Sequence, residues 1–204
     1  MTSVHYTRDL EALFMKAPKL KERILYTLQF FPEVGSIKFG KASKNAYYDP
    51  NTGSVRLTKN CSYYVIGHEI THHLQYFNKG NEFPKGERQC DIFLFARSPA
   101  LVIDLWNTRD GSYLCRAIKV DLLREHFTKL EGQQMIYETC AEALRRRKEG
   151  HGHYMDWAEK RINERIAEKT NTRTDEKTYV KPMLKDAKLL QSTLNIFSFV
   201  RGRR

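Results

Sequence analysis

The sequence predicts an α+β fold, in which helices pack on a small antiparallel sheet and a mainly helical C-terminal half follows. Apolar residues recur at helical spacing over 7–30 and again from residue 120. Over 37–58 they instead alternate with polar residues, as in half-exposed strands. The 204-residue chain is 41% hydrophobic and 12% aromatic, which indicates a folded core and excludes wholesale disorder.

Two short helices are expected at the N-terminus. The first should cover 7–15, where apolar residues share one helix face. The second should cover 18–30, because Pro18 suits the first position of a helix and Pro32 cannot continue one. Both are expected to pack behind the sheet.

Three short strands should follow these helices. Ile37 and Phe39 alternate with lysines in the first. The other two, at 46–48 and 54–58, flank the strong turn sequence of residues 49–53, Asp-Pro-Asn-Thr-Gly. We therefore expect an antiparallel sheet of about three strands.

The stretch over 67–75 carries a His-Glu-x-x-His motif on a largely apolar helix that should end near Phe77. His68 and His72 are four residues apart, so they share one helix face and can hold two corners of a tetrahedral Zn²⁺ site. Glu69 lies about 100° further round the helix, where its carboxylate can take a proton from zinc-bound water. The motif therefore predicts two metal ligands and a general base.

Neighbouring residues complete the expected motif helix. Asn60 or Ser62 can cap its N-terminus. His73 follows the second histidine of the motif and points off the metal face, so we expect it to be partly exposed or hydrogen-bonded to the backbone.

A third ligand is expected in the next helix, which Pro84 should open and Pro99 should close. Glu87 and Asp91 are four residues apart, so both point the same way from an otherwise apolar helix. Such a carboxylate pair requires a cation or hydrogen-bond donors. A catalytic zinc usually has three protein ligands, so either carboxylate is a candidate.

The amino-acid sequences of these two helices resemble those of known metallopeptidase families. GHEITHHLQ is similar to the active-site helix of the zincins, in which a strand beside the cleft pairs with extended substrate. E-x-x-x-D after H-E-x-x-H resembles the gluzincins, and ERQCDIFLFA resembles the ImmA/IrrE-type peptidases. The resemblance implies a minimal zincin core, with Glu87 as the third zinc ligand and Asp91 as the hydrogen-bond partner of a zinc-bound histidine.

A second histidine-rich segment offers another ligand. HGHYMDWAEKRIN resembles the H-G-x-x-aromatic segment of the SprT/Spartan family, which implies that His151 competes with Glu87 for the zinc. His153 or Tyr154 would alternatively stabilise an oxyanion above the cleft. The alternative prediction is that this segment is the N-terminus of a helix without a role in the site, with Trp157 packed into the core.

The four cysteines contain no C-x-x-C pair. The N-terminus has no secretory signal, so we expect reduced thiols, a cytoplasmic location, and a zinc held by histidine and carboxylate. No apolar run is long enough for a membrane span. The net charge of +11 is compatible with a nucleic-acid partner or an acidic protein substrate.

Three regions are expected along the chain. They are a zincin-like metallopeptidase core over 1–110, a helical extension packed on it over 111–192, and a basic tail over 193–204. Within them we expect a loop over 107–112, a polar loop over 169–180 and a final helix near 182–192.

The sequence favours a zinc-dependent metalloendopeptidase of the His-Glu-x-x-His type. Glu69 would assist the attack of zinc-bound water on a peptide bond, in a protein or peptide substrate that is associated with nucleic acid by analogy with the SprT-like and ImmA/IrrE families. The alternative is a basic nucleic-acid-binding protein with a structural or relic zinc site.

Overall fold

The computed structural model describes residues 2–77, 82–106 and 113–171. The chain divides into two compact units, Met1–Asn163 and Glu164–Arg204, and the fold described below is that of the first unit. Several expected segments lie wholly or mostly outside the described residues: the loop over 107–112, the polar loop over 169–180, the helix near 182–192 and the tail over 193–204.

The N-terminal helices are confirmed as α1, Arg8–Phe14, and α2, Pro18–Leu28. They bury apolar faces that include Leu10 and Ile24. A strand that the sequence did not reveal, β1 at Ser3–Tyr6, precedes them. Its four residues are too few for an alternating pattern to stand out, and none of their side chains is fully buried.

The sheet contains β1, β2 (Ser36–Lys41), β3 (Tyr47–Asp49) and β4 (Ser54–Leu57), in the order β1-β2-β4-β3. The prediction of an antiparallel sheet is wrong, because β1 pairs with β2 and β2 pairs with β4 in parallel. Only β3 and β4 are antiparallel. The sequence showed the hairpin but not the pairing partner of β2. Because the connection through α1 and α2 crosses over the sheet, β2 runs in the same direction as β1.

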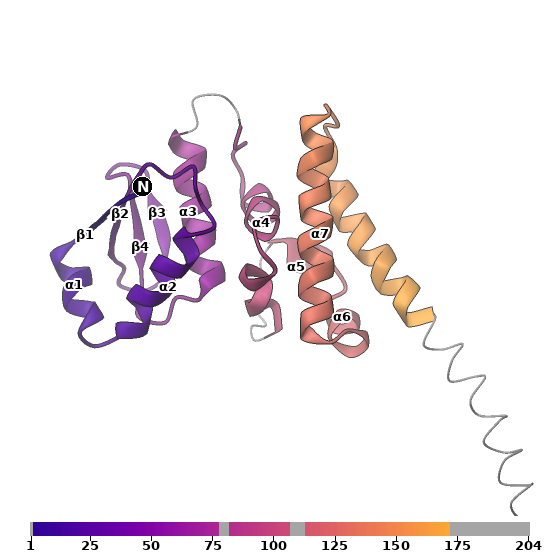
Figure 1. Cartoon of the computed structure of the whole chain (residues 1–204), viewed down its shortest axis with the longest axis horizontal. Helices are drawn as coiled ribbons and strands as arrows, with labels where there is room; N and C mark the ends of the chain where they lie inside the picture. The colour runs from indigo at the N-terminus through magenta and orange to yellow at the C-terminus, as the bar shows by residue number, and fades with distance from the viewer. Residues whose placement is uncertain (1, 78–81, 107–112, 172–204) are drawn as a thin grey trace, which may run out of the picture. The chain divides into compact units, whose positions relative to one another are not determined.

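The predicted turn between β3 and β4 is confirmed. The backbone N–H of Asn51 donates to Asp49 Oδ1 at 3.0 Å, and Gly53 has a φ of 61°, a conformation that glycine adopts without strain. One face of the sheet is apolar, because Phe39 and Val55 are paired and both fully buried. Figure 1 shows α1, α2 and α3 around the sheet.

The motif helix is confirmed as α3, Tyr63–Phe77. Of the two candidate caps, Ser62 accepts a hydrogen bond from the backbone N–H of Val65, at 3.3 Å. The next helix, α4, covers Glu87–Phe95 and so begins three residues later than its proline predicted. Gly86, with a φ of 129°, turns the chain into it.

The C-terminal half is helical, as predicted. It contains a 3₁₀ helix η1 at Pro99–Trp106, α5 at Tyr113–Ala117, α6 at Val120–His126, α7 at Lys129–Lys148 and a helix that begins at residue 154. Helix α4 contacts both α3 and α7 and lies between them (Figure 1). The α+β class is thus confirmed. Within the described part of the chain, no helix is both long and apolar enough to cross a bilayer.

Candidate metal site

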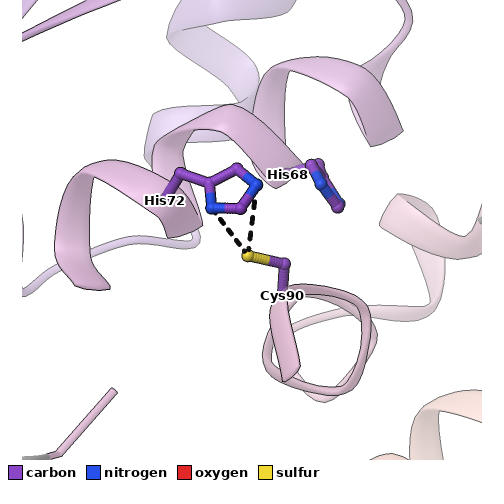
Figure 2. Close-up of side chains that lie close together, drawn as sticks. All are labelled: His68, His72 and Cys90. Atoms are coloured by element: carbon purple, nitrogen blue, oxygen red, sulfur yellow. Dashed lines mark hydrogen bonds between the residues drawn. The ribbon is translucent and has the colours of Figure 1, made fainter. Parts of the chain in front are cut away.

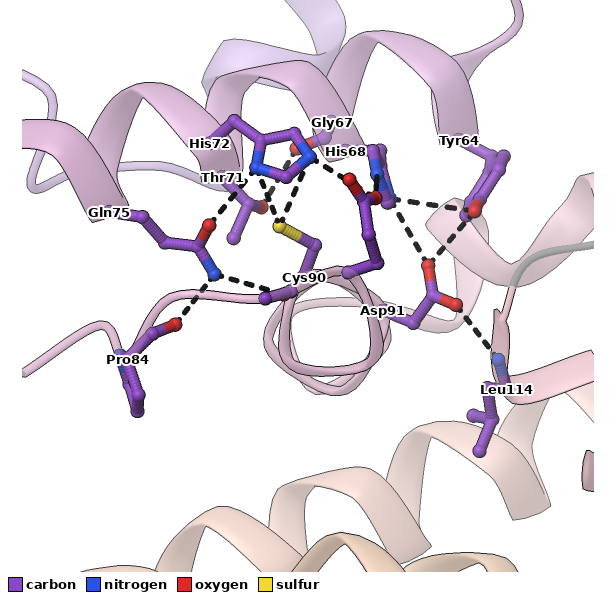
Figure 3. Close-up of polar contacts among 12 residues, drawn as sticks. Tyr64, Gly67, His68, Thr71, His72, Gln75, Pro84, Cys90, Asp91 and Leu114 are labelled. Atoms are coloured by element: carbon purple, nitrogen blue, oxygen red, sulfur yellow. Dashed lines mark hydrogen bonds and ion pairs between the residues drawn. The ribbon is translucent and has the colours of Figure 1, made fainter.

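Helices α3 and α4 approach closely at Gly67. A Cβ atom at this position would lie 2.4 Å from Leu94 Cδ1, so only glycine permits this packing without a shift. The close approach brings His68 and His72, one turn apart on α3, against the first turn of α4. Glu87, Cys90 and Asp91 of α4 all contact these histidines, and Figure 3 shows Cys90 and Asp91 pointing toward them.

Both motif histidines point Nε2 at the same carboxylate oxygen. Glu87 Oε2 lies 2.9 Å from His68 Nε2 and 3.3 Å from His72 Nε2. Two ligand atoms held about 2.0–2.2 Å from one tetrahedral metal ion are separated by roughly 3.3–3.6 Å. Both measured separations lie within a few tenths of an ångström of this range, as expected if Glu87 and each histidine were ligands of one metal ion.

The other nitrogen of the His68 ring is held by Asp91. Asp91 Oδ1 lies 3.2 Å from His68 Nδ1 and accepts a hydrogen bond from the Tyr64 hydroxyl at 2.9 Å. Its second oxygen accepts the backbone N–H of Leu114, also at 2.9 Å (Figure 3). Asp91 is fully buried, so these donors offset the cost of desolvating its charge.

Gln75 orients the His72 ring, as Asp91 orients the His68 ring. His72 Nδ1 lies 3.0 Å from Gln75 Oε1, and Gln75 Nε2 donates to the backbone carbonyls of Pro84 and Gly86 (Figure 3). Gln75 therefore also fixes the loop that leads into Glu87. With Nδ1 of both rings assigned as the donor, both Nε2 lone pairs are left for a metal.

The titration of the cluster reflects its crowded carboxylates. Burial lowers the pKa of His68, but the hydrogen bond and charge of Asp91, with Glu69 and Glu87, outweigh burial and raise the pKa overall. For Glu87 the two effects have the opposite signs. Burial raises its pKa, and the hydrogen bonds and charges of His68 and His72 lower it by more, so the pKa of Glu87 lies below its usual range. The two carboxylates thus favour a positive charge between them.

Glu69 lies beside the cluster but is not among the groups in hydrogen-bond contact with the two Nε2 atoms. It is buried, and burial raises the pKa of its carboxyl despite the charges of His68 and His72. The backbone of Tyr48 in β3 acts in the opposite sense and lowers the pKa of this carboxyl. Glu69 and His68 line a cleft of roughly 350 Å³, together with residues 44–46 and several residues between 58 and 65.

Cys90 belongs to the cluster although the sequence reasoning left it out. His68, His72 and Cys90 form a group that could hold a metal ion, with ligand atoms within 4.8 Å of one another. The Cys90 sulfur lies 3.4 Å from His72 Nδ1 and 3.7 Å from Nε2 (Figure 2). Searching only for C-x-x-C pairs missed it. The usable signal was its position three residues after Glu87, on the same helix face.

The histidine-rich segment contributes no ligand to this group. His151 and His153 are exposed, and within the described residues neither joins a potential metal-binding group. The Tyr154 hydroxyl donates to Gln89 Oε1 at 2.6 Å. The helix that begins at residue 154 also contacts α4 through ion pairs. Arg88 of α4 pairs with Asp156 at 2.8 Å and with Glu159.

His73 is hydrogen-bonded to the backbone, which was one of its two predicted environments. Its Nε2 lies 3.1 Å from the carbonyl oxygen of Ser36, and the residue is buried, so partial exposure is excluded. Its ring packs against Phe77 at a centroid distance of 4.7 Å.

No family model, no curated protein and no solved structure matches this chain. Any function must therefore be argued from the cluster itself. Its chemistry is that of a candidate metal site, with the buried carboxyl of Glu69 at its edge.

Proposed function

We propose that this protein is a zinc-dependent metallopeptidase that hydrolyses peptide bonds in protein or peptide substrates. The observation that carries the proposal is the convergence of His68 Nε2, His72 Nε2 and Glu87 Oε2 on one point, with the buried Glu69 beside it. Two histidines and one glutamate are a known ligand set of catalytic zinc. The resemblance of the sequence to zincins supports the same assignment.

Zinc at this point would act as a Lewis acid that polarises a carbonyl and acidifies water. Glu69 would serve as the general base and then return the proton to the leaving amine. Its raised pKa suits this task, because a base whose pKa lies nearer neutrality can also act as an acid. Asp91 and Gln75 would hold the two imidazoles in the ligating tautomer.

The sheet offers a place for an extended substrate. Strand β3 lies at the end of the strand order, and its Tyr48 backbone is near enough to Glu69 to lower the pKa of that carboxyl. A peptide added along this edge would run beside the general base. We propose β3 as the strand that aligns the substrate.

The test is Glu69→Gln, with casein and a DNA-binding protein as substrates, each with and without DNA. We expect the variant to retain zinc, because Glu69 is not a ligand, and to lose cleavage by about 10²–10⁴-fold, the usual contribution of a general base. Zinc content and cleavage rate are measured on the same preparation. A zinc-loaded wild type that cleaves none of the substrates would contradict the proposal.

One observation favours a second candidate, a basic nucleic-acid-binding protein with a structural zinc. Cys90 supplies a fourth donor near the same point, and a site with four protein ligands is typical of structural zinc. The net charge of +11 suits a polyanion. In this case Glu69→Gln would leave zinc content and nucleic-acid binding unchanged, and DNA or RNA binding would weaken steeply with salt.

A further inference from the structure

Cys90 is the donor of this cluster that the proposed chemistry does not use. It is fully buried, and its sulfur faces the side of the His72 ring that carries both nitrogens (Figure 2). It lies one turn from Glu87 on α4, as His68 and His72 lie one turn apart on α3. Two pairs of donors therefore oppose each other across the Gly67–Leu94 contact.

The position of the sulfur fits a fourth corner of the same metal site. With zinc–sulfur and zinc–nitrogen bonds of about 2.3 and 2.05 Å, a tetrahedral ion separates the two ligand atoms by roughly 3.5 Å. The Cys90 sulfur is 3.7 Å from His72 Nε2, and its distance to a His68 ring nitrogen is no more than 4.8 Å. A shift of about 0.2 Å relative to His72 and of at most about 1.3 Å relative to His68 would bring the sulfur to these separations.

We propose that Cys90 is a fourth, displaceable metal ligand that closes the site in the resting protein. The regulatory part of this proposal rests on the peptidase function proposed above. On metal binding the thiol gives its proton to solvent, and the sulfur takes the fourth position on the metal. No metal-bound water then faces Glu69. Hydrolysis then requires that the sulfur leave this position when substrate enters the cleft.

The ligand set also implies a choice of metal. Thiolate and imidazole suit Zn²⁺ and Co²⁺, whereas Mg²⁺ and Ca²⁺ prefer oxygen ligands. The protein should therefore bind Zn²⁺ and Co²⁺ tightly in the presence of excess Mg²⁺.

Cobalt substitution tests the coordination without any measurement of activity. The Co²⁺-loaded wild type should show a thiolate-to-cobalt charge-transfer absorption band, and Cys90→Ala should lose it. Cys61→Ala is the matched control, because Cys61 is another buried cysteine. Its sulfur accepts a hydrogen bond from the backbone N–H of Thr58 and does not contact His72. The band of Cys61→Ala should be unchanged. Zinc affinity, measured by competition with a chelator, should fall at least roughly tenfold in Cys90→Ala only.

Cys90→Ser, which nearly preserves the volume of the side chain, guards against a folding defect and should also lose the band. A metal-loaded wild type without the band would overturn the proposal whatever its activity.

Cleavage rates test the closing of the site. With saturating zinc, Cys90→Ala should cleave peptide faster than wild type, because water has permanent access to the fourth position. Equal rates would overturn the claim that the sulfur closes the site. If neither protein cleaves any substrate while the cobalt band is present, the peptidase function fails and the coordination by Cys90 stands.

Discussion

His68 and His73 lie five residues apart on α3, both are buried, and their surroundings are opposite. The His68 ring is placed between Asp91 and Glu87, and the pKa of His68 is raised. The His73 ring contacts a backbone carbonyl and two aromatic rings, and burial lowers its pKa. No hydrogen-bond partner for His73 Nδ1 occurs in the described part of the chain. Burial alone therefore does not distinguish a candidate metal ligand, whereas carboxylates on both sides of the ring set His68 apart from His73.

The largest expected difference between the two histidines is in metal binding. Apparent zinc-binding free energies of about 10–16 kcal/mol are shared among four ligands in structural sites, so one ligand is worth on the order of 3 kcal/mol. His68→Gln should therefore weaken zinc binding by about a hundredfold, and His73→Gln should leave it within about a factor of three. Chelator competition measures both. Equal losses of zinc affinity in the two variants would contradict the assignment of His68, and not His73, as a zinc ligand.

A smaller effect is expected from making the environment of His68 more like that of His73. Asp91→Asn removes the charge behind the His68 ring, and its amide cannot accept from all the donors that now meet Asp91. We expect zinc affinity to fall about 10–100-fold and the free energy of unfolding to fall by about 1–3 kcal/mol.

Asp156→Asn is the control for this change, because Asp156 is an exposed aspartate that pairs with Arg88 of α4 and with His153. It should change the free energy of unfolding by no more than about 0.5 kcal/mol and leave zinc affinity unaltered. Loss of zinc affinity in both variants would point to a general effect on α4 and not to the bond between Asp91 and His68.

The smallest effect is on the pH dependence of stability in the metal-free protein. The raised pKa of His68 contributes stability that is full below the unfolded pKa of about 6.5 and is lost as pH rises through the folded value. The lowered pKa of His73 has the opposite sign: its contribution is full above about pH 6.5 and is lost as pH falls toward the folded value.

Urea unfolding in the presence of a chelator measures these contributions. The stability advantage of wild type over His68→Gln should shrink above about pH 6.5, and the advantage over His73→Gln should shrink below it. Parallel curves for the two variants would contradict the assigned environments.

Much of this protein could be predicted from short sequence patterns. The two N-terminal helices, the hairpin turn and α3 were predicted within one or two residues, because helix periodicity, Ser62 and the Asp49–Gly53 turn are local signals. The parallel pairing of β2 with β1 and β4 was not, since pairing partners are chosen by long-range packing. Strand β1 was missed because its four residues are too few for an alternating pattern to stand out.

The candidate site divides in the same way. By itself, the four-residue spacing of His68 and His72 determined that two imidazoles share one helix face, and the spacing of Glu87 and Asp91 indicated a second polar helix face. Only the tertiary structure decided that these faces meet, through the close packing at Gly67. It also decided that Gln75 orients His72, that Cys90 joins the cluster, and that His151 lies outside its ligand group. Helical spacing fixes which side chains point together along one element, whereas the approach of two elements depends on the packing of the whole core.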